Sequence, residues 1–287
     1  PIVDKRSRTV IGVLAGRPNC TPPRWNNCVK RMSAVLDSGR RELESHLTDS
    51  QMKGVKSTRG QSIALQAGYQ YGNGRPHPMP RSQGYPLSVK EFLDKVTSDP
   101  NFEELAGFMS NSFRSYAPDL IKHYEETLAK LRHHRPDLVE PFLSSILPTV
   151  TVNLRPCTSC APHRDSANLP FGLCGITSLG SFGPSKGGHL VLWELKLVVE
   201  FPPGSTILIP SSIIMHSNLP LGNPAQERRF SFTQYASGEL FRWVEIGFRG
   251  HKSMFGTGAR AERAKSKHYE SLDYAKKGFA MLAKYPS

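Results

Sequence analysis

The chain has few cysteines and no long apolar run. Five cysteines in 287 residues, an odd number, argue against a disulfide scaffold and favour a reducing compartment. No apolar run approaches the roughly 20 residues that a membrane helix needs, and no signal-peptide pattern opens the chain. We therefore expect a soluble, intracellular protein with no membrane partner. Because the first residue is Pro1, we also expect the natural start to be missing or processed.

Acidic residues are scarce as well. The chain has 24 Asp and Glu against 37 Lys and Arg, which gives a formal net charge of +13 and a pI near 9.7. This excess favours a polyanionic partner, because Lys and Arg side chains that neutralise phosphates release counterions. Charge alone does not name the partner, and the sequence shows no obligate protein partner.

Two histidines and one aspartate are the most informative group in the sequence. His163 and Asp165 are two residues apart, so on a strand both side chains leave the same face and can reach one ion. His216 follows the apolar run 205–210, and a returning strand would bring it back to the other two. Two imidazoles and one carboxylate can occupy one face of an octahedral iron(II) ion and leave three positions open. We therefore predict that His163, Asp165 and His216 are metal ligands and catalytic residues.

Structural zinc is an alternative for part of this stretch. Cys157 and Cys160 form a Cys-x-x-Cys pair shortly before His163. The chain lacks a second Cys-x-x-Cys pair that would complete four zinc ligands. We therefore keep zinc as the minor interpretation.

An arginine and a serine follow the last of these predicted ligands on one strand face. Arg229 and Ser231 are two residues apart. A guanidinium can bind a carboxylate through paired hydrogen bonds, and a hydroxyl can add a third. Phe230 and Phe232 lie on the opposite face and are expected to pack under covering helices. Arg228 is the rival anchor if the strand phase is shifted by one residue.

Alternation predicts one more residue at the site. Segment 149–155 alternates apolar and polar residues, and its polar set faces the site. We therefore expect Asn153 to contact the same ligand as Arg229.

Apolar spacing predicts both helices and strands. We predict helices over 25–47, from a capping box at 88–91, through 102–113, from 118 to about 136, and in the basic tail 251–287. We predict strands at 10–13, 149–155, 172–179, 188–193, 197–201, 205–209, 213–216, 228–235 and 241–248. These strands are enough for two facing sheets.

Segment 53–85 is rich in Gly, Pro, Ser and Arg, and it is predicted to be a loop. Glycines at 68–76 bracket aromatic and amide residues and permit close approach of a ligand, although a structural turn is an equal alternative. We select Asn73 and Arg75 as substrate contacts. The basic residues suited to holding phosphates are Lys53, Lys56, Arg59 and Arg75.

Five features in order resemble the double-stranded β-helix family of iron(II) and 2-oxoglutarate dioxygenases. They are His-x-Asp at 163–165, Gly-Gly-His-Leu at 187–190, Pro-Gly-Ser at 203–205, His216, and Arg-x-Ser at 229–231. The resemblance implies an α+β fold with a jelly-roll core of two facing antiparallel sheets, buttressed by N-terminal and C-terminal helices. It also implies Fe(II), 2-oxoglutarate and O2, with Arg229, Ser231 and Asn153 binding the 2-oxoglutarate.

This resemblance implies one dioxygenase domain over 1–287. We expect a mainly helical portion with the Gly-rich loop at 1–148, the β-helix core at 149–250, and a basic helical tail at 251–287.

Within this family the residues look most like the TET and J-binding-protein branch, including its compact fungal members, which oxidises methyl groups on nucleobases. Asn168 stands where that branch places an amide against the target base, and Tyr235 stands where a tyrosine stacks near it. The position two residues past that tyrosine is Ser237, where the animal enzymes have a histidine that contacts cytosine. This departure puts strict cytosine recognition in doubt.

The branch implies a nuclear enzyme acting on double-stranded DNA with methylated bases, which are flipped out of the duplex. We expect 5-methylcytosine as the main substrate, oxidised to 5-hydroxymethylcytosine and further, with N6-methyladenine as a second substrate. The alternatives are a hydroxylase of proteins or small molecules, and a catalytically idle DNA-binding module.

Overall fold

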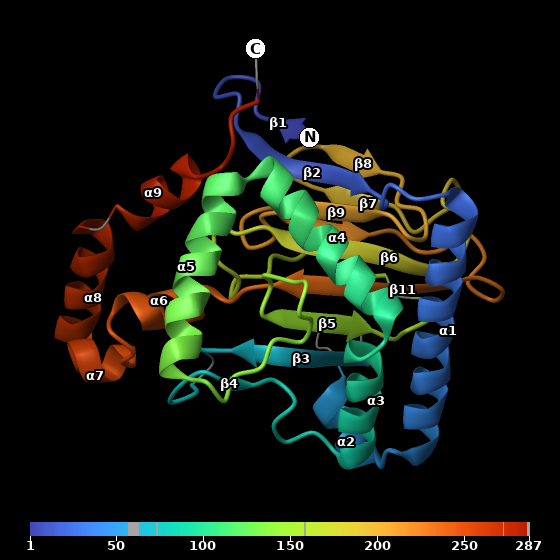
Figure 1. The fold of residues 1–287 in the computed structure, drawn as a ribbon, viewed down its shortest axis with the longest axis horizontal. Coiled ribbons are helices and arrows are strands. Elements are labelled where there is room, and N and C mark those ends of the chain that lie inside the picture. Colours follow the sequence, from blue (N-terminus) through green and yellow to red (C-terminus); the bar gives the residue numbers. More distant parts are fainter. Residues whose placement is uncertain (57–62, 73, 158, 272, 286–287) are drawn as a thin grey trace.

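The computed structural model describes residues 1–56, 63–72, 74–157, 159–271 and 273–285, which form strands and helices (Figure 1). The strands are β1 Ile2–Val3, β2 Val10–Gly16, β3 Ala64–Gln70, β4 Met79–Pro80, β5 Thr149–Asn153, β6 Cys174–Ser181, β7 Leu190–Leu192, β8 Leu197–Val199, β9 Thr206–Ile209, β10 His216–Asn218 and β11 Arg228–Tyr235. The helices are α1 Pro22–His46, α2 Asp49–Val55, α3 Leu87–Thr97, α4 Pro100–Tyr116, α5 Pro118–His134, α6 Gly238–Glu245, α7 His251–Phe255, α8 Ala259–Ser271 and α9 Tyr274–Ala280.

Two antiparallel sheets form the framework. The major sheet has eight strands in the order β1-β2-β9-β6-β11-β5-β3-β4, and the minor sheet has three in the order β10-β7-β8. Strands far apart in sequence are neighbours, for example β9 between β2 and β6, as in a jelly roll. The predicted fold class, a double-stranded β-helix within an α+β protein, is confirmed.

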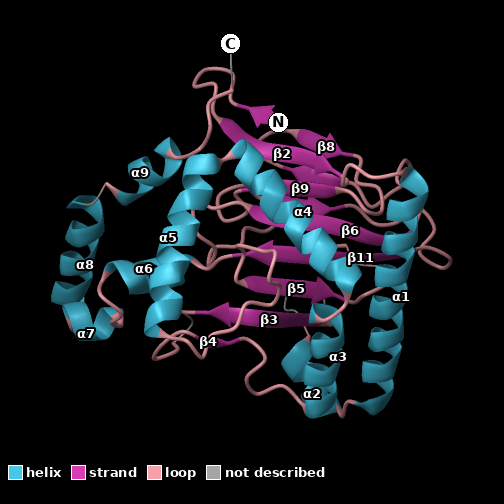
Figure 2. Cartoon of the chain, viewed as in Figure 1, coloured by secondary structure: helices cyan, strands magenta, loops and turns pink. Residues whose placement is uncertain are grey.

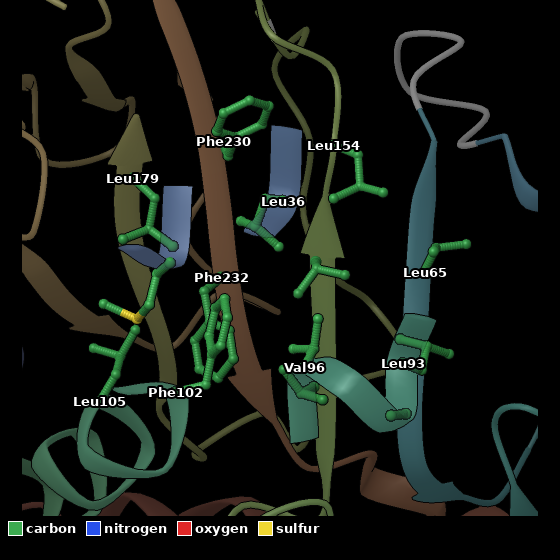
Figure 3. Packing of buried hydrophobic residues seen from close by; sticks show 14 of the residues in the cluster. Leu36, Leu65, Leu93, Val96, Phe102, Leu105, Leu154, Leu179, Phe230 and Phe232 are labelled. Atoms are coloured by element: carbon green, nitrogen blue, oxygen red, sulfur yellow. The ribbon is translucent and has the colours of Figure 1, made fainter. Parts of the chain in front are cut away.

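Helices cover one face of the major sheet (Figure 2). The alternation of β11 explains this arrangement, because Phe230 and Phe232 are buried on the helix side. Phe102 of α4 packs on Phe232 with ring centroids 5.5 Å apart, and Figure 3 shows the two rings side by side. The opposite face of β11 is therefore left for polar residues.

Helix α1 is fixed to the turn before β9. The indole Nε1 of Trp25 donates to the carbonyl of Gly204 at 3.0 Å. Gly204 has φ +83°, and a Cβ there would lie 2.6 Å from Val29 Cγ2. Only glycine meets both demands without strain, so Gly204 lets the helix approach the sheet.

The predicted loop over 53–85 is wrong in three places. Lys53 lies in α2, Met79 and Pro80 form β4, and residues 64–70 form β3, which pairs with β5 from Ala64↔Asn153 to Gly68↔Thr149. The segment has few β-branched residues, so its strand conformation comes from this pairing rather than from propensity.

The predicted strand over 241–248 is also wrong, because most of it lies in α6. Leu240, Phe241 and Trp243 are buried, and Phe241 packs on Tyr124 of α5 with centroids 4.7 Å apart. In this segment the apolar residues fit a helix that packs on another helix as well as they fit a strand, and the packing decides.

Smaller differences occur at element ends. Helix α3 begins at Leu87 with Pro86 as N-cap, so Ser88 makes no capping box. A capping box forms instead between Thr48 and Gln51 at the start of α2. The strand predicted at 213–216 begins only at His216. In the described part of the chain no helix is both long enough and apolar enough to cross a membrane.

The tail returns to the start of the chain after α9. The amide of Val10 donates to the carbonyl of Ala283 at 2.9 Å, and Thr9 and Lys284 form an antiparallel bridge. Leu282 is buried, and the ring of Phe279, which is 37% exposed, lies 6.4 Å from the ring of Phe171, so apolar residues of the tail pack on the body. Leu272, another apolar residue of the tail, lies outside the described residues.

The packing of α4 can be tested with two leucines of opposite burial. Leu105 is 0% exposed and Leu143 is 95% exposed. We expect Leu105→Ala to lower the free energy of unfolding by about 2–5 kcal/mol, because it removes buried surface and leaves a cavity. Leu143→Ala should change it by less than about 0.5 kcal/mol. Urea denaturation followed by circular dichroism measures both, and equal losses would contradict the packing of α4.

Candidate metal centre and cavity

The structure brings His163, Asp165 and His216 together. One ligand atom from each lies within 4.8 Å of the others. Nε2 of His163 is 3.9 Å from Oδ1 of Asp165, and Nε2 of His216 is 3.8 Å from Oδ2 of the same carboxylate. Two nitrogens and one oxygen in this geometry can bind a divalent transition metal on one side.

Backbone hydrogen bonds hold the three residues in place. The amide of His163 donates to the carbonyl of His216 at 3.0 Å, and the amide of His216 donates to the carbonyl of His163 at 2.9 Å. The amide of Asp165 donates to the carbonyl of Ser211 at 2.9 Å. The predicted strand position of His163 and Asp165 is wrong, because His163 forms only an isolated bridge with His216 and Asp165 lies in a loop. Instead, backbone hydrogen bonds to Ser211 and His216 hold this loop against the segment that leads from β9 into β10.

Both imidazoles present the same nitrogen to the centre. Nδ1 of His163 lies 2.8 Å from the carbonyl of Ala161, and Nδ1 of His216 lies 2.9 Å from the carbonyl of Ile214. A carbonyl only accepts, so each Nδ1 carries the proton. Each Nε2 then has a lone pair for a metal, which is the arrangement that orients histidine ligands.

A cavity of about 610 Å³ opens beside this group. One face of β11 lines it through Arg229, Ser231, Thr233 and Tyr235. Arg229 and Tyr235 lie at opposite ends of this cavity wall. At a rise of about 3.3 Å per residue, the two residues are about 20 Å apart along the strand. The cavity is large enough for a small dicarboxylate together with part of a second molecule.

Arg229 is a buried cation with no carboxylate partner among the described residues. Its side chain is 3% exposed, its Nε has no hydrogen-bond partner, and it forms no ion pair with any described residue. Burial lowers the pKa of Arg229 to about 10, so it stays charged at neutral pH. Gly188 leaves room for it, since a Cβ there would lie 3.3 Å from Arg229 Cδ. Such an arginine fits an anionic ligand.

The neighbouring candidates share this end of the cavity. Nδ2 of Asn153 donates to Oγ of Ser231 at 2.9 Å, and both residues line the cavity. Arg228 faces away, and its Nη1 donates to the backbone carbonyls of the turn at 224–227. The strand phase therefore places Arg229, and not Arg228, on the cavity side.

Asn168 and Tyr235 line the cavity on the wall away from Arg229. Nδ2 of Asn168 donates to Oγ of Ser211 at 3.0 Å. The Tyr235 hydroxyl accepts from Nε2 of Gln66 at 3.0 Å and exchanges a 3.0 Å hydrogen bond with Thr151. Burial raises the pKa of Tyr235 to about 12, so the hydroxyl is neutral at physiological pH.

The side chain of Ser237 is hydrogen-bonded to the backbone of Tyr71. Its hydroxyl donates to the Tyr71 carbonyl at 3.2 Å and accepts from the Tyr71 amide at 3.4 Å. Ser237 also pairs with Asn168 through a backbone bridge, which places the two side by side. The hydroxyl therefore fixes the Gly-rich segment to the end of β11.

The two candidates from the Gly-rich segment differ in outcome. Asn73 lies outside the described residues. Arg75 does not line the cavity, but its neighbour Arg81 does. Four residues of this wall were not predicted, because their only signal in the sequence is their position near the glycines: Gln66, Gln70, Arg81 and Tyr85.

The zinc alternative gains no support from the described residues. Cys157 and Cys160 form no disulfide and belong to no metal-ligand group among those residues. Sγ of Cys157 donates to the carbonyl of Pro224 at 3.2 Å.

Comparison with known proteins adds evidence on the fold. No protein-family model and no curated protein sequence matches the chain. Among solved structures it is similar to NgTET1, solved in complex with 5mC DNA, with 14% identity, a TM-score of 0.50, and coverage of 77% of this chain and 70% of that one. A Pseudomonas putida prolyl-4-hydroxylase has 13% identity, a TM-score of 0.34 and coverage of 79% and 91%. A 2OG-Fe(II) oxygenase family oxidoreductase from Burkholderia pseudomallei has 13% identity, a TM-score of 0.35 and coverage of 77% and 94%.

At these identities the NgTET1 likeness shows the fold alone. The chain is thus a double-stranded β-helix protein with a His-Asp-His group. The donor set fits iron(II), and the unpaired Nε of Arg229 fits a carboxylate of 2-oxoglutarate.

Metal binding tests the ligand group directly. We expect one divalent ion to bind per chain in anaerobic calorimetric titration with Fe(II) or Mn(II). Asp165→Ala should weaken binding at least about 100-fold, because even groups that only orient a ligand are worth about 10–100-fold. His46→Ala, at the exposed end of α1, is the matched control for loss of an imidazole. Unchanged affinity in Asp165→Ala would exclude this site.

Proposed function

We propose that the chain is an iron(II)- and 2-oxoglutarate-dependent oxygenase that oxidises the methyl group of a flipped-out base in double-stranded DNA. The observation that carries this proposal is one cavity containing both the His163-Asp165-His216 group and the buried, carboxylate-free Arg229. A group of metal ligands alone, or a buried arginine alone, would be compatible with many functions.

Different residues of the chain would bind the metal and the 2-oxoglutarate. The Nε2 atoms of His163 and His216 and the carboxylate of Asp165 would hold the metal. Arg229, with Ser231 and Asn153 beside it, would bind the distal carboxylate of 2-oxoglutarate and fix its orientation. Burial makes this interaction strong, because water does not compete with the carboxylate there.

When bound, iron(II) with 2-oxoglutarate and O2 supplies the oxidising chemistry that inserts oxygen at a methyl C–H bond. The residues at the Tyr235 end would hold the substrate. A methyl group inside a duplex cannot reach a cavity of this kind, so the base must be flipped out, at about a few kcal/mol of unstacking. Tyr235 would then present its ring and Asn168 its amide to that base.

Three observations support methylated DNA as the substrate class. The chain carries a net charge of +13. NgTET1, which shares its fold, was solved with 5mC DNA. Asn168 and Tyr235 stand together on the cavity wall. We propose 5-methylcytosine as the main substrate and N6-methyladenine as the second, because Ser237 places no imidazole against the base. We also propose a nuclear location.

Substrate class is tested by product analysis. We expect succinate and 5-hydroxymethylcytosine when the chain, Fe(II) and 2-oxoglutarate meet a duplex containing 5-methylcytosine, with less product from N6-methyladenine. Mass spectrometry of digested nucleosides measures both. Asp165→Ala, which should form no product, is the negative control. Succinate release without any modified nucleoside would contradict the DNA substrate and favour a protein or small-molecule hydroxylase.

Adjacent arginines test the cosubstrate anchor. We expect Arg229→Ala to raise the 2-oxoglutarate concentration for half-maximal rate by roughly 10–100-fold, since a hydrogen bond to a charged group is worth about 1.5–3 kcal/mol. Arg228→Ala removes the same charge from the opposite strand face and should stay within about twofold. Calorimetric binding of 2-oxoglutarate to the metal-loaded protein gives a second readout. A defect in Arg228→Ala alone would show that the anchor is misassigned.

A further inference from the structure

A second arginine group lies at the other end of the same cavity. Arg81 lines the cavity together with Gln70 and Tyr85. The amide of Arg81 donates to the carbonyl of Gly68 at 2.8 Å, and Gly68 pairs with Thr149, which in turn pairs with Tyr235. The register therefore places Arg81 at the Tyr235 end of β11, about 20 Å along the strand from Arg229.

Two guanidinium groups converge there on one neutral acceptor. With its amide oriented to satisfy both, the side-chain oxygen of Gln70 accepts from Nη1 of Arg75 and from Nη1 of Arg81. Gln70 is 6% exposed, so the acceptor is fixed by burial. Two like charges on one amide oxygen repel each other, and an amide cannot neutralise them.

In the described part of the chain, no carboxylate neutralises the charges of this arginine pair. Neither Arg75 nor Arg81 forms an ion pair with any residue that the structure describes, and Nε of Arg81 is buried without a hydrogen-bond partner. Burial, and then the like charge of Arg81, lower the pKa of Arg75. Among the described residues that line the cavity, the only carboxylate is Asp165. An anion at this end would satisfy the unpaired Nε and relieve the repulsion.

We propose that Arg75 and Arg81, held in place by Gln70, form an anion site that binds a backbone phosphate next to the flipped nucleotide. The inference rests on the proposed function in taking DNA as the substrate. A flipped nucleotide brings its own phosphodiesters to the cavity mouth, and a guanidinium fork matches phosphate oxygens. Lys56, which also lines the cavity, adds positive charge to the mouth.

The site is tested by DNA binding without iron or 2-oxoglutarate, so turnover is not needed. The probe is a labelled duplex with one 5-methylcytosine, and its affinity is measured at several salt concentrations. We expect Arg81→Gln and Arg75→Gln each to weaken binding and to reduce the slope of log affinity against log salt by about one. Arg41→Gln, an exposed arginine paired with Asp37 on α1, controls for the loss of one charge and should leave the slope unchanged.

An uncharged phosphate analogue in the DNA shows which phosphate the arginine pair contacts. Replacing single phosphates beside the methylated nucleotide with methylphosphonates should weaken wild-type binding at one position by roughly tenfold. The methylphosphonate at that position should weaken DNA binding by Arg81→Gln less than about twofold further. The reason is that the effects of removing both partners of one contact are not additive. Thermal melting and 2-oxoglutarate affinity should match the wild type in both arginine variants.

Two results would overturn the anion site. One is an unchanged salt slope in Arg81→Gln. The other is a loss of preference for methylated over unmethylated duplex at constant slope, which would mean that Arg81 contacts the base. Either result leaves the oxygenase proposal standing if the wild type still forms 5-hydroxymethylcytosine. Conversely, the expected slopes without turnover would contradict the oxygenase proposal alone.

Discussion

Two backbone hydrogen bonds between His163 and His216 are the constraint on which the candidate site depends. They join a loop that follows β5 to the first residue of β10, and they place both imidazoles on the same side. Each ring then donates its Nδ1 proton to a nearby carbonyl, so the orientation of both Nε2 atoms is set by the backbone. Asp165 enters the group because its amide is bonded to Ser211. Pre-organisation of this kind lets three residues meet without side-chain reordering.

The cavity beside this group is unusual in its charges. Cationic groups stand at both ends of β11, and the one carboxylate among its described lining residues belongs to the metal-ligand group. Burying arginines without partners destabilises a folded chain, so an unpaired guanidinium marks a place where a ligand completes the structure. One end suits a dicarboxylate and the other a phosphate, and the distance between them separates the two ligands. One wall of the cavity therefore carries two separate cationic sites, about 20 Å apart along β11.

The phase of β11 connects packing to function. Phe230 and Phe232 anchor the strand under α4, and this packing forces Arg229 and Ser231 to the opposite face. A slip by one residue would turn Arg229 under the helices and bring Arg228 to the cavity side instead. The same alternation, read from the sequence, predicted which arginine faces the site, because a strand with one apolar and one polar face has a single stable phase.

The sequence by itself determined the ligand types, the strand faces of β5 and β11, and most helices, because these follow from short-range spacing and from side-chain chemistry. It did not determine the strand at 64–70 or the helix at 238–245, where pairing with β5 and packing on α5 override weak local preferences. Only the tertiary structure brought Arg81 to the Tyr235 end of the cavity and joined it to Arg75 through Gln70. Nothing in local spacing records that contact, because it depends on how a loop folds over the edge of a sheet.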